Sequence, residues 1–387
     1  MGTVYHAELR VPQGFARQVA VKVMRSRGER AAPFRARMRD EARLLGMLQD
    51  EHVLRVIELT QVAGLDCVIM EYVEGADLLE ALQTAPVPPR ALAELAAVVA
   101  GTLHRAHTAR HPNSGEALNV IHRDVKPANL MVTGQGGVRL LDFGVARAKF
   151  DSRESRTEGL VLGTLNYFPP EVMLGQHPTS AVDIFGLALS IWECATGKDW
   201  GPPTVDVRPF NRRVAQRLDQ LPESYGALVP GLQMMLAYEP EDRATGEQAE
   251  TALHEATQRC GGPDLRAWAR AVIPGLIDQR NAPALDRLVG QTLTLGRGGK
   301  QRPLEVIDPP IRTASGPEVM TYNDLAPPSA VNRVGEDGRA GNAPVARPKP
   351  RTRPWLIMTG AIGLGLGCGL MIGLTVLGAA VFASQWF

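Results

Sequence analysis

Apolar residues alternate with other residues near the N-terminus and then recur at helical spacing. In residues 18–24 three valines occupy every second position, which predicts a strand with one apolar face and Lys22 on the other. A helix is predicted to begin at Pro33 and to carry an apolar stripe as far as Leu48, and Glu41 falls on that stripe. A carboxylate on a buried face is costly unless paired, so Lys22 is its natural partner. Taken singly, each of the two residues reads equally well as a solvated surface charge.

Two short apolar runs further along predict a β-hairpin. Residues 130–132 and 138–141 have strand character and are joined by the glycine-containing turn Thr133–Gly137. Since a hairpin brings its ends together, Asn129 and Asp142, which flank it, are expected to lie close enough to share a metal ion.

Composition divides the chain into three regions. Residues 1–258 alternate strand-like and helix-like segments, whereas residues 259–354 are rich in Pro, Gly, Arg and Asp and are predicted to be a largely disordered linker. Within that linker, residues 264–280 have the pattern of a short amphipathic helix, interrupted by Pro274, and the pattern leaves open whether this helix packs on the preceding domain or folds alone. Residues 355–383 contain no charge and are predicted to form a transmembrane helix, because a buried core helix rarely runs so long without one.

The charges around this apolar segment predict its orientation. The short tail 384–387 is uncharged, while four basic residues directly precede the segment: Arg347, Lys349, Arg351 and Arg353. The positive-inside rule then predicts a single-pass protein of the cell (inner) membrane with residues 1–354 in the cytoplasm, and the basic cluster is suited to anionic lipid headgroups. Gly365, Gly369 and Gly373 repeat the GxxxG spacing, which fits a homodimer as well as it fits a generic anchor with small residues.

Overall charge and cysteine usage exclude other classes of protein. Lys and Arg number 42 against 41 Asp and Glu, so no basic field indicates a nucleic-acid partner. The four cysteines show neither metal-binding spacing nor a disulfide framework, and the first ten residues lack the apolar core of a secretory signal.

Two motifs in order carry the candidate chemistry. HRDVKPAN spans His122 to Asn129, and LLDFG follows, ending at Gly144. In them Asp124 can accept a hydroxyl proton, while Asn129 and Asp142 can hold Mg²⁺. The pair resembles the signature of protein kinases, and in particular the eukaryotic-type serine/threonine kinases of bacteria. The resemblance extends from the N-terminus to about residue 257 and implies an α+β fold of two lobes, a small β-rich N-lobe and a larger helical C-lobe.

The resemblance implies a role for each charged residue. Lys22 would contact the α- and β-phosphates of ATP and pair with Glu41. Asp124 would orient and deprotonate the hydroxyl of a protein substrate, and Lys126 would steady the γ-phosphate. A lysine two residues after the aspartate is the serine/threonine pattern. Mg²⁺, or Mn²⁺ in its place, would be the metal.

Residues 68–78 resemble the strand and hinge that hold adenine. The resemblance implies backbone contacts from Glu71 and Val73 to the purine edge, with Met70 as the gatekeeper. Asp77 reads equally as a ribose ligand or as the N-cap of the following helix. The full set of implied nucleotide contacts is Gly2, Val4, Ala20, Lys22, Met70, Glu71, Val73, Asp77 and Met131.

Downstream, GTLNYFPPE at residues 163–171 resembles the substrate-docking loop, with Thr164 in the docking position and Pro169 in place of the usual alanine. The resemblance implies an ion pair between Glu171 and Arg243.

Two further residues match positions that the resemblance connects with the catalytic loop. Asp183 would brace that loop, and Arg123 would dock a phosphorylated activation segment. Candidate phosphorylation sites in that segment are Ser152, Ser155 and Thr157, which are favoured over the alternative of a flexible polar loop with incidental hydroxyls.

The glycine-rich loop departs from the family pattern. Gly2 matches its third glycine and Val4 the apolar residue after it, but the first two glycines and the first strand are absent, so the N-lobe sheet is expected to lack an edge strand. A start codon assigned too late is favoured over a compromised kinase. An active membrane-anchored kinase, with autophosphorylation between copies, is accordingly expected over a pseudokinase scaffold. A small-molecule kinase is disfavoured because it would lack the docking segment.

Overall fold

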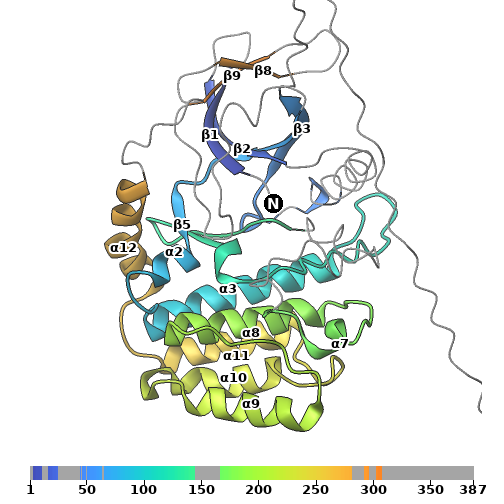
Figure 1. Ribbon diagram of the computed structural model, residues 1–387, viewed down its shortest axis with the longest axis vertical. Coiled ribbons are helices and arrows are strands. Elements are labelled where there is room, and N and C mark those ends of the chain that lie inside the picture. The colour runs from blue at the N-terminus through green and yellow to red at the C-terminus, as the bar shows by residue number, and fades with distance from the viewer. Residues whose placement is uncertain are drawn as a thin grey trace, which may run out of the picture. The chain divides into compact units, whose positions relative to one another are not determined.

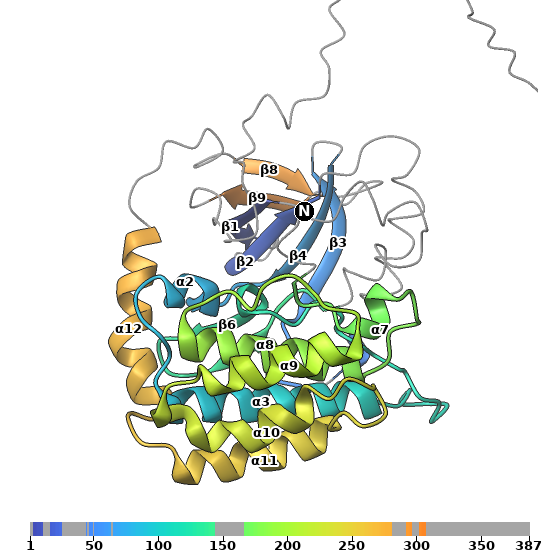
Figure 2. The ribbon, with the colours of Figure 1, turned by 60° about the horizontal axis from the view of Figure 1, so that its bottom comes forward.

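The computed structural model describes residues 3–10, 16–24, 44, 46–48, 50–62, 65–143, 166–280, 292–295 and 302–306 (Figure 1). Within these residues a lobe of antiparallel strands, the N-lobe, is followed by a larger lobe of helices, the C-lobe (Figures 1 and 2). The two-lobed α+β architecture predicted from the sequence is confirmed.

Four strands from the first part of the chain form the centre of the N-lobe sheet. They are β1 (Thr3–Arg10), β2 (Ala16–Val23), β3 (Val56–Val62) and β4 (Leu65–Glu71), in the order β3-β4-β2-β1. β2 confirms the alternating pattern, because its three valines are buried in one apolar cluster with residues of β1 and β4. Lys22 lies opposite Val4 in the β1–β2 register.

Two further strands come from the segment that composition predicts to be disordered. β9 (Arg302–Val306) pairs antiparallel with β1, and β8 (Thr292–Leu295) pairs with β9. Residues 292–295 and 302–306 are therefore strands and not disordered linker, and β9 lies beside β1 although the family's first strand is absent from the sequence. The physical reason is that β1 offers a row of backbone N–H and C=O groups, which an extended segment satisfies whatever its sequence distance.

The helix expected within residues 264–280 is present as α12 (Leu265–Arg280), with Pro274 inside it. Trp268, Ala269 and Ile273 are buried in the C-lobe core. Of the two alternatives for this helix, packing on the preceding domain is therefore the one observed, because its apolar stripe lies against the C-lobe.

Helices make up most of the C-lobe. They are α2 (Leu78–Leu82), α3 (Pro89–Thr108), α7 (Pro170–Met173), α8 (Ala181–Thr196), α9 (Val207–Asp219), α10 (Val229–Met235) and α11 (Gly246–Arg259), with the 3₁₀ turns η1 (Pro127–Asn129) and η2 (Glu223–Leu228). α8 is buried at nearly every position, including Asp183 and Glu193. It packs on α3 and α10 and therefore forms the core to which the site is attached (Figure 2).

Glycine permits a close contact between α3 and α11. A Cβ on Gly246 would lie 2.8 Å from the Cβ of His104, closer than real Cβ contacts allow. Gly246 is also the first residue of α11, where Thr245 and Gln248 form a reciprocal capping box.

A second, three-stranded sheet combines the strand before α2 with two strands that follow α3. β5 (Gly75–Asp77), β6 (Leu130–Thr133) and β7 (Val138–Leu140) follow in that spatial order, and β6–β7 is the predicted hairpin. Gly136 takes φ +85° in its turn, which glycine adopts without strain.

The connection from α3 to His122 is a closed surface loop. Arg110 and Ala117 form a β-bridge, and the N–H of Leu118 donates to the carbonyl of Ala109 at 2.9 Å. Residues 112–117 are exposed.

Among the described residues, no helix has both the length and the apolar character needed to cross a membrane. The predicted span 355–383, the basic residues before it and the tail 384–387 lie outside the described residues.

Candidate active site

One buried carboxylate, that of Asp183, organises the loop that carries HRDVKPAN. Its Oδ1 accepts the N–H of Arg123 at 2.6 Å and its Oδ2 accepts the N–H of His122 at 2.8 Å. The Nε2 of His107, at the end of α3, lies 2.8 Å from the same Oδ2. Burial would raise the pKa of Asp183, but these hydrogen bonds and the two histidines hold it below its ordinary value. The bracing that sequence resemblance implied is therefore present, and it includes His107.

Backbone strain is concentrated at the same place. Arg123 takes φ 66° and Asp142 takes φ 58°, in the left-handed region that residues other than glycine rarely occupy. Such conformations persist only where surrounding contacts enforce them, and they cluster at functional sites. For Arg123 the contact is the Asp183 carboxylate.

The candidate base, Asp124, is held by two neighbours. The Nζ of Lys126 lies 3.0 and 2.9 Å from its two carboxylate oxygens, and the Nδ2 of Asn129 donates to its backbone carbonyl at 2.7 Å and to its Oδ2 at 3.1 Å. Lys126 and Asn129 are both buried. The three side chains are thus fixed relative to one another.

Lys22 pairs with the carboxylate of Asp142 across the two lobes. Its Nζ lies 2.6 and 2.5 Å from the two oxygens. Burial would raise the pKa of Asp142, but Lys22, with His122 and Lys126, outweighs that effect and keeps it below its ordinary value. The partner expected from the sequence, Glu41, lies outside the described residues, so that pair stays a prediction.

Asn129 and Asp142 are brought together by the hairpin, as predicted. The N–H of Leu141 donates to the carbonyl of Asn129 at 2.9 Å, which closes its base. Because the amide nitrogen of Asn129 is taken up by Asp124, its amide oxygen is the atom left for a cation, beside a carboxylate kept ionised. Oxygen ligands of this kind suit Mg²⁺, so the residues fit the metal.

His122 fixes the turn into Asp142. Its Nδ1 accepts the N–H of Asp124 at 3.2 Å, so its Nε2 donates to the carbonyl of Leu141 at 2.7 Å. The ring also packs on Phe143, with centroids 4.5 Å apart.

The residues implied in nucleotide binding surround the end of β4. Ala20 lies opposite Met70 in the β2–β4 register, and both are buried. Met131 lies opposite Asp77 in the β5–β6 pair, and Val73 is half-buried. Asp77 is the N-cap of α2, accepting the N–H of Glu80 at 2.8 Å, so the capping reading of this residue holds.

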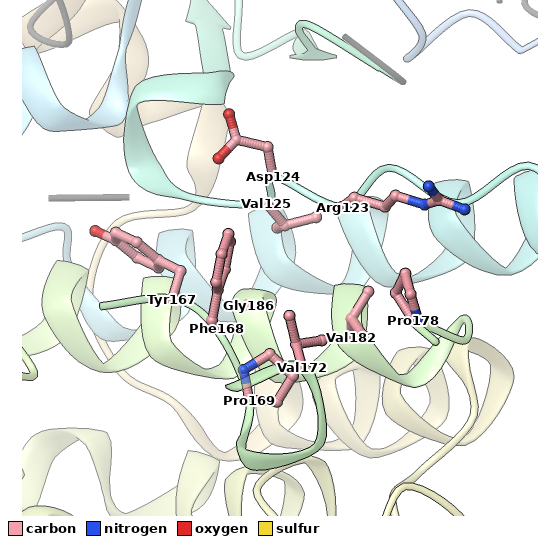
Figure 3. Close-up of a pocket in the computed structure, with 10 residues that line it drawn as sticks. All are labelled: Arg123, Asp124, Val125, Tyr167, Phe168, Pro169, Val172, Pro178, Val182 and Gly186. Carbon is pink, nitrogen blue, oxygen red and sulfur yellow. The ribbon is translucent and has the colours of Figure 1, made fainter. Parts of the chain in front are cut away.

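A pocket lies beside Asp124 (Figure 3). It is lined by Arg123, Asp124, Val125, Tyr167, Phe168, Pro169, Val172, Pro178, Val182 and Gly186. A Cβ on Gly186 would lie 2.7 Å from the carbonyl oxygen of Val125, so glycine lets α8 approach this loop. The segment after Asn166 therefore forms a wall of the site.

Tyr167, which lines this pocket, forms a hydrogen-bonded pair with Glu193 that was not predicted from the sequence. The hydroxyl of Tyr167 donates to the Oε2 of Glu193, and the N–H of Trp200 donates to Oε1 at 3.1 Å. Burial raises the pKa of Glu193 to about 7, although both hydrogen bonds act in the opposite direction. The signal available in the sequence was a lone glutamate in the apolar run of α8.

Glu171 and Arg243 form the ion pair that the resemblance implied. The guanidinium nitrogens lie 2.7 and 3.2 Å from the two carboxylate oxygens, and both side chains are buried. The guanidinium also lies over the ring of Phe185, 5.0 Å from its centroid. This pair connects the end of the docking segment to the C-lobe core.

Several predicted site residues lie outside the described residues: Gly2, Glu41, Ser152, Ser155, Thr157 and Thr164. Their proposed roles stay predictions.

Comparison with known proteins gives consistent similarities. Residues 1–255 match the protein kinase domain family. The chain is 32% identical over 296 residues to the tyrosine-protein kinase MasK of Myxococcus xanthus, covering 70% of this chain and 44% of that protein. It is 30% identical over 392 residues to the serine/threonine-protein kinase PknH of Mycobacterium bovis, covering 95% of this chain and 60% of that one. The chain thus spans about half the length of these two relatives.

A solved structure is also similar. The PknI kinase domain of Mycobacterium tuberculosis superposes with a TM-score of 0.50 at 26% identity, covering 66% of this chain and 91% of that one.

Proposed function

This chain belongs to the protein kinase family, and from that membership we propose that it transfers the γ-phosphoryl group of ATP to serine or threonine residues of proteins. Two hydrogen-bonded groups carry the proposal: Lys22 with Asp142, and Asp124 with Lys126 and Asn129. The backbone bond from the N–H of Leu141 to the carbonyl of Asn129 connects the two groups. Serine/threonine specificity is supported by Lys126 and by the names of several relatives, including PknH. The name of MasK makes tyrosine the alternative acceptor.

The chain's own groups divide the chemistry between them. Asp124 accepts the proton of the attacking hydroxyl, and Lys126, hydrogen-bonded to that carboxylate, offers its ammonium to the transferred phosphoryl group. Lys22 supplies positive charge to the phosphates in a site where fixed charges need no reorganisation. Mg²⁺, or Mn²⁺, held by Asn129 and Asp142, would neutralise charge on the phosphate oxygens.

The decisive experiment replaces the base. We expect Asp124→Asn to lower kcat by about 10²- to 10⁴-fold, the usual contribution of a general base, with little change in nucleotide affinity. Incorporation of labelled phosphate and analysis of the modified amino acids measure activity and acceptor together. The matched control is Asp219→Asn, an exposed carboxylate at the end of α9. Equal and wild-type-like incorporation by both variants would remove the assignment of Asp124 as the base, whereas no incorporation by the wild type or by the control would leave a nucleotide-binding scaffold.

We also propose anchorage in the cell membrane through residues 355–383, with the kinase domain in the cytoplasm. The uncharged stretch and the basic residues before it support this. Anchoring two copies nearby would favour phosphorylation of Ser152, Ser155 or Thr157 in trans, and Arg123 would bind the phosphate. Mass spectrometry of active protein decides whether these residues are modified.

A further inference from the structure

The helix α12 packs beside the three-stranded sheet and the helix that follows its first strand. It contacts β5, β6 and α2 as well as α3, and it lies alongside α2 and β5 in Figure 1. The protein kinase match ends at residue 255, so α12 lies beyond the part of the chain that the family accounts for. These contacts are therefore an addition to the matched domain, and they are made next to elements of the candidate site.

The turn of the β6–β7 hairpin lies against the backbone of α12. A Cβ on Gly136 would lie 2.9 Å from the Cα of Arg266, closer than real Cβ contacts allow. A Cβ on Gly134 would lie 3.7 Å from the Cγ of Pro274, an ordinary van der Waals contact. Both glycines of this turn thus face α12, and Gly136 permits the helix to approach closely.

The opposite end of the same hairpin carries the two candidate metal ligands. Leu130 pairs with Leu140, and the next residue, Leu141, donates its N–H to the carbonyl of Asn129 at 2.9 Å. Asp142 follows directly. The turn and both ligands therefore belong to one short hydrogen-bonded unit, so a displacement of the turn relative to the C-lobe displaces Asn129 and Asp142 as well.

Other segments hold the strands of this hairpin. β5 pairs with β6 on one side. On the other side the N–H of Leu140 donates to the carbonyl of His52 at 2.7 Å, and the N–H of Leu54 donates to the carbonyl of Leu140 at 3.2 Å. The bonds with His52 and Leu54 lie at the end near Asp142, whereas α12 lies at the turn. The hairpin is thus supported at both of its ends.

α12 is fixed in turn to the core of the C-lobe. The N–H of Leu265, its first residue, donates to the Oε2 of Glu94 on α3 at 2.8 Å. Ala269 and Ile273 are both 0% exposed and belong to the same buried cluster as Val132 of β6. Because interiors are close-packed, a helix seated in this way restricts the movement of the hairpin beside it.

We propose that α12 is a positioning element of the catalytic site, which fixes the β6–β7 hairpin and thereby holds Asn129 and Asp142 in place for a metal ion. Ala269 and Ile273 are its positioning residues, because they lie in the core and act on the reaction only through the hairpin. The effect on phosphoryl transfer rests on the proposed kinase function, whereas the support of the hairpin by α12 does not.

The same substitution on opposite faces of α12 tests this support in the full chain. Ala269→Asp places a charge in the core and should displace the helix, while Ala271→Asp, the matched control, places it on the exposed face. We expect Ala269→Asp to speed amide exchange at Gly136 and Leu141 by about tenfold, and the control to exchange like the wild type. Unchanged exchange in a folded Ala269→Asp protein contradicts the proposal.

A milder pair of variants separates positioning from stability, and it serves also if Ala269→Asp does not fold. Ile273→Ala on α12 and Leu253→Ala on α11 each truncate a side chain that is 0% exposed, so both should lower the melting temperature. At a temperature where both are folded, we expect only Ile273→Ala to speed exchange in the hairpin and to raise the Mg²⁺ concentration for half-maximal activity by about tenfold.

Equal exchange and an equal Mg²⁺ requirement in these two variants would show that α12 contributes stability alone, and would overturn the proposal. A wild type that transfers no phosphate refutes the proposed kinase function instead. In that case the exchange rates of the hairpin amides still decide whether α12 supports the hairpin.

Discussion

At the scale of single residues, the site depends on a few buried polar side chains whose partners lie far away in sequence. Asp183 and His107 are 76 positions apart, and Tyr167 and Glu193 are 26 apart. The motifs identify Lys22, Asp124 and Asp142, because their spacing is distinctive. The motifs do not indicate that His107 contacts Asp183 or that Tyr167 contacts Glu193, because these contacts depend on how the helices pack in three dimensions.

Removal of the His107 side chain tests the bracing of the catalytic loop. We expect His107→Ala to lower kcat by about tenfold, or roughly 1.4 kcal/mol, because one oxygen of Asp183 loses a partner in a buried environment. Steady-state kinetics measure this, and the KM for ATP should change little. The control is His254→Ala, an exposed histidine on α11. A kcat equal to that of the control would show that the two backbone N–H groups suffice.

Glu193 makes stability depend on pH in a direction opposite to most carboxylates. Folding raises its pKa from 4.5 to about 7, so the folded protein binds this proton more tightly than the unfolded chain. The resulting stability is present below pH 4.5 and is lost as the pH rises to about 7, amounting to a few kcal/mol at most. Denaturant unfolding of the wild type and Glu193→Gln should show this loss only in the wild type. Parallel pH curves would mean that Glu193 keeps an ordinary pKa.

At the scale of elements, the pattern of residues correctly predicted those strands and turns whose formation depends only on neighbouring residues. The alternating valines of β2 and the glycine turn of β6–β7 require only neighbouring residues, and both elements formed as expected. β8 and β9 were missed because Gly, Arg and Pro residues around them lower the mean hydropathy of the segment. Their stability comes instead from pairing with β1, almost three hundred positions earlier. The position of α12 on the C-lobe was left open for the same reason.

The contribution of α12 can be measured through its tryptophan. Trp268 is 6% exposed and packs in the C-lobe core. We expect Trp268→Ala to lower the free energy of unfolding by about 3–5 kcal/mol, the usual cost of truncating a large buried aromatic side chain. Thermal unfolding measures the effect, with Arg270→Ala on the exposed side of α12 as the control. Equal melting temperatures would show that α12 is detached in solution.

At the scale of the whole molecule, the assignments of the kinase fold and of the membrane anchor rest on different kinds of observation. The kinase fold rests on sequence motifs, described geometry and family membership together. Membrane anchorage rests on the composition of residues 347–383 alone.

Vesicle experiments test that anchorage and its orientation. We expect the kinase domain to sediment with inner membranes and to be digested by protease in inverted vesicles but protected in right-side-out vesicles. Arg351→Glu combined with Arg353→Glu weakens the charge bias and should reduce the correctly oriented fraction. A kinase domain found in the supernatant after gentle lysis, or digested in right-side-out vesicles, contradicts the prediction.

The loop between α3 and His122 is a suitable insertion site for protein engineering. His107 and His122 stand at its two ends and are both bonded to Asp183, while the backbone contact between Ala109 and Leu118 closes it at its base. Changes in the exposed residues 112–117 are therefore isolated mechanically from the catalytic residues. A fluorescent reporter or an affinity tag inserted there would be displayed on the surface without passing its motion to Asp124, so the kinase can be labelled at an internal position.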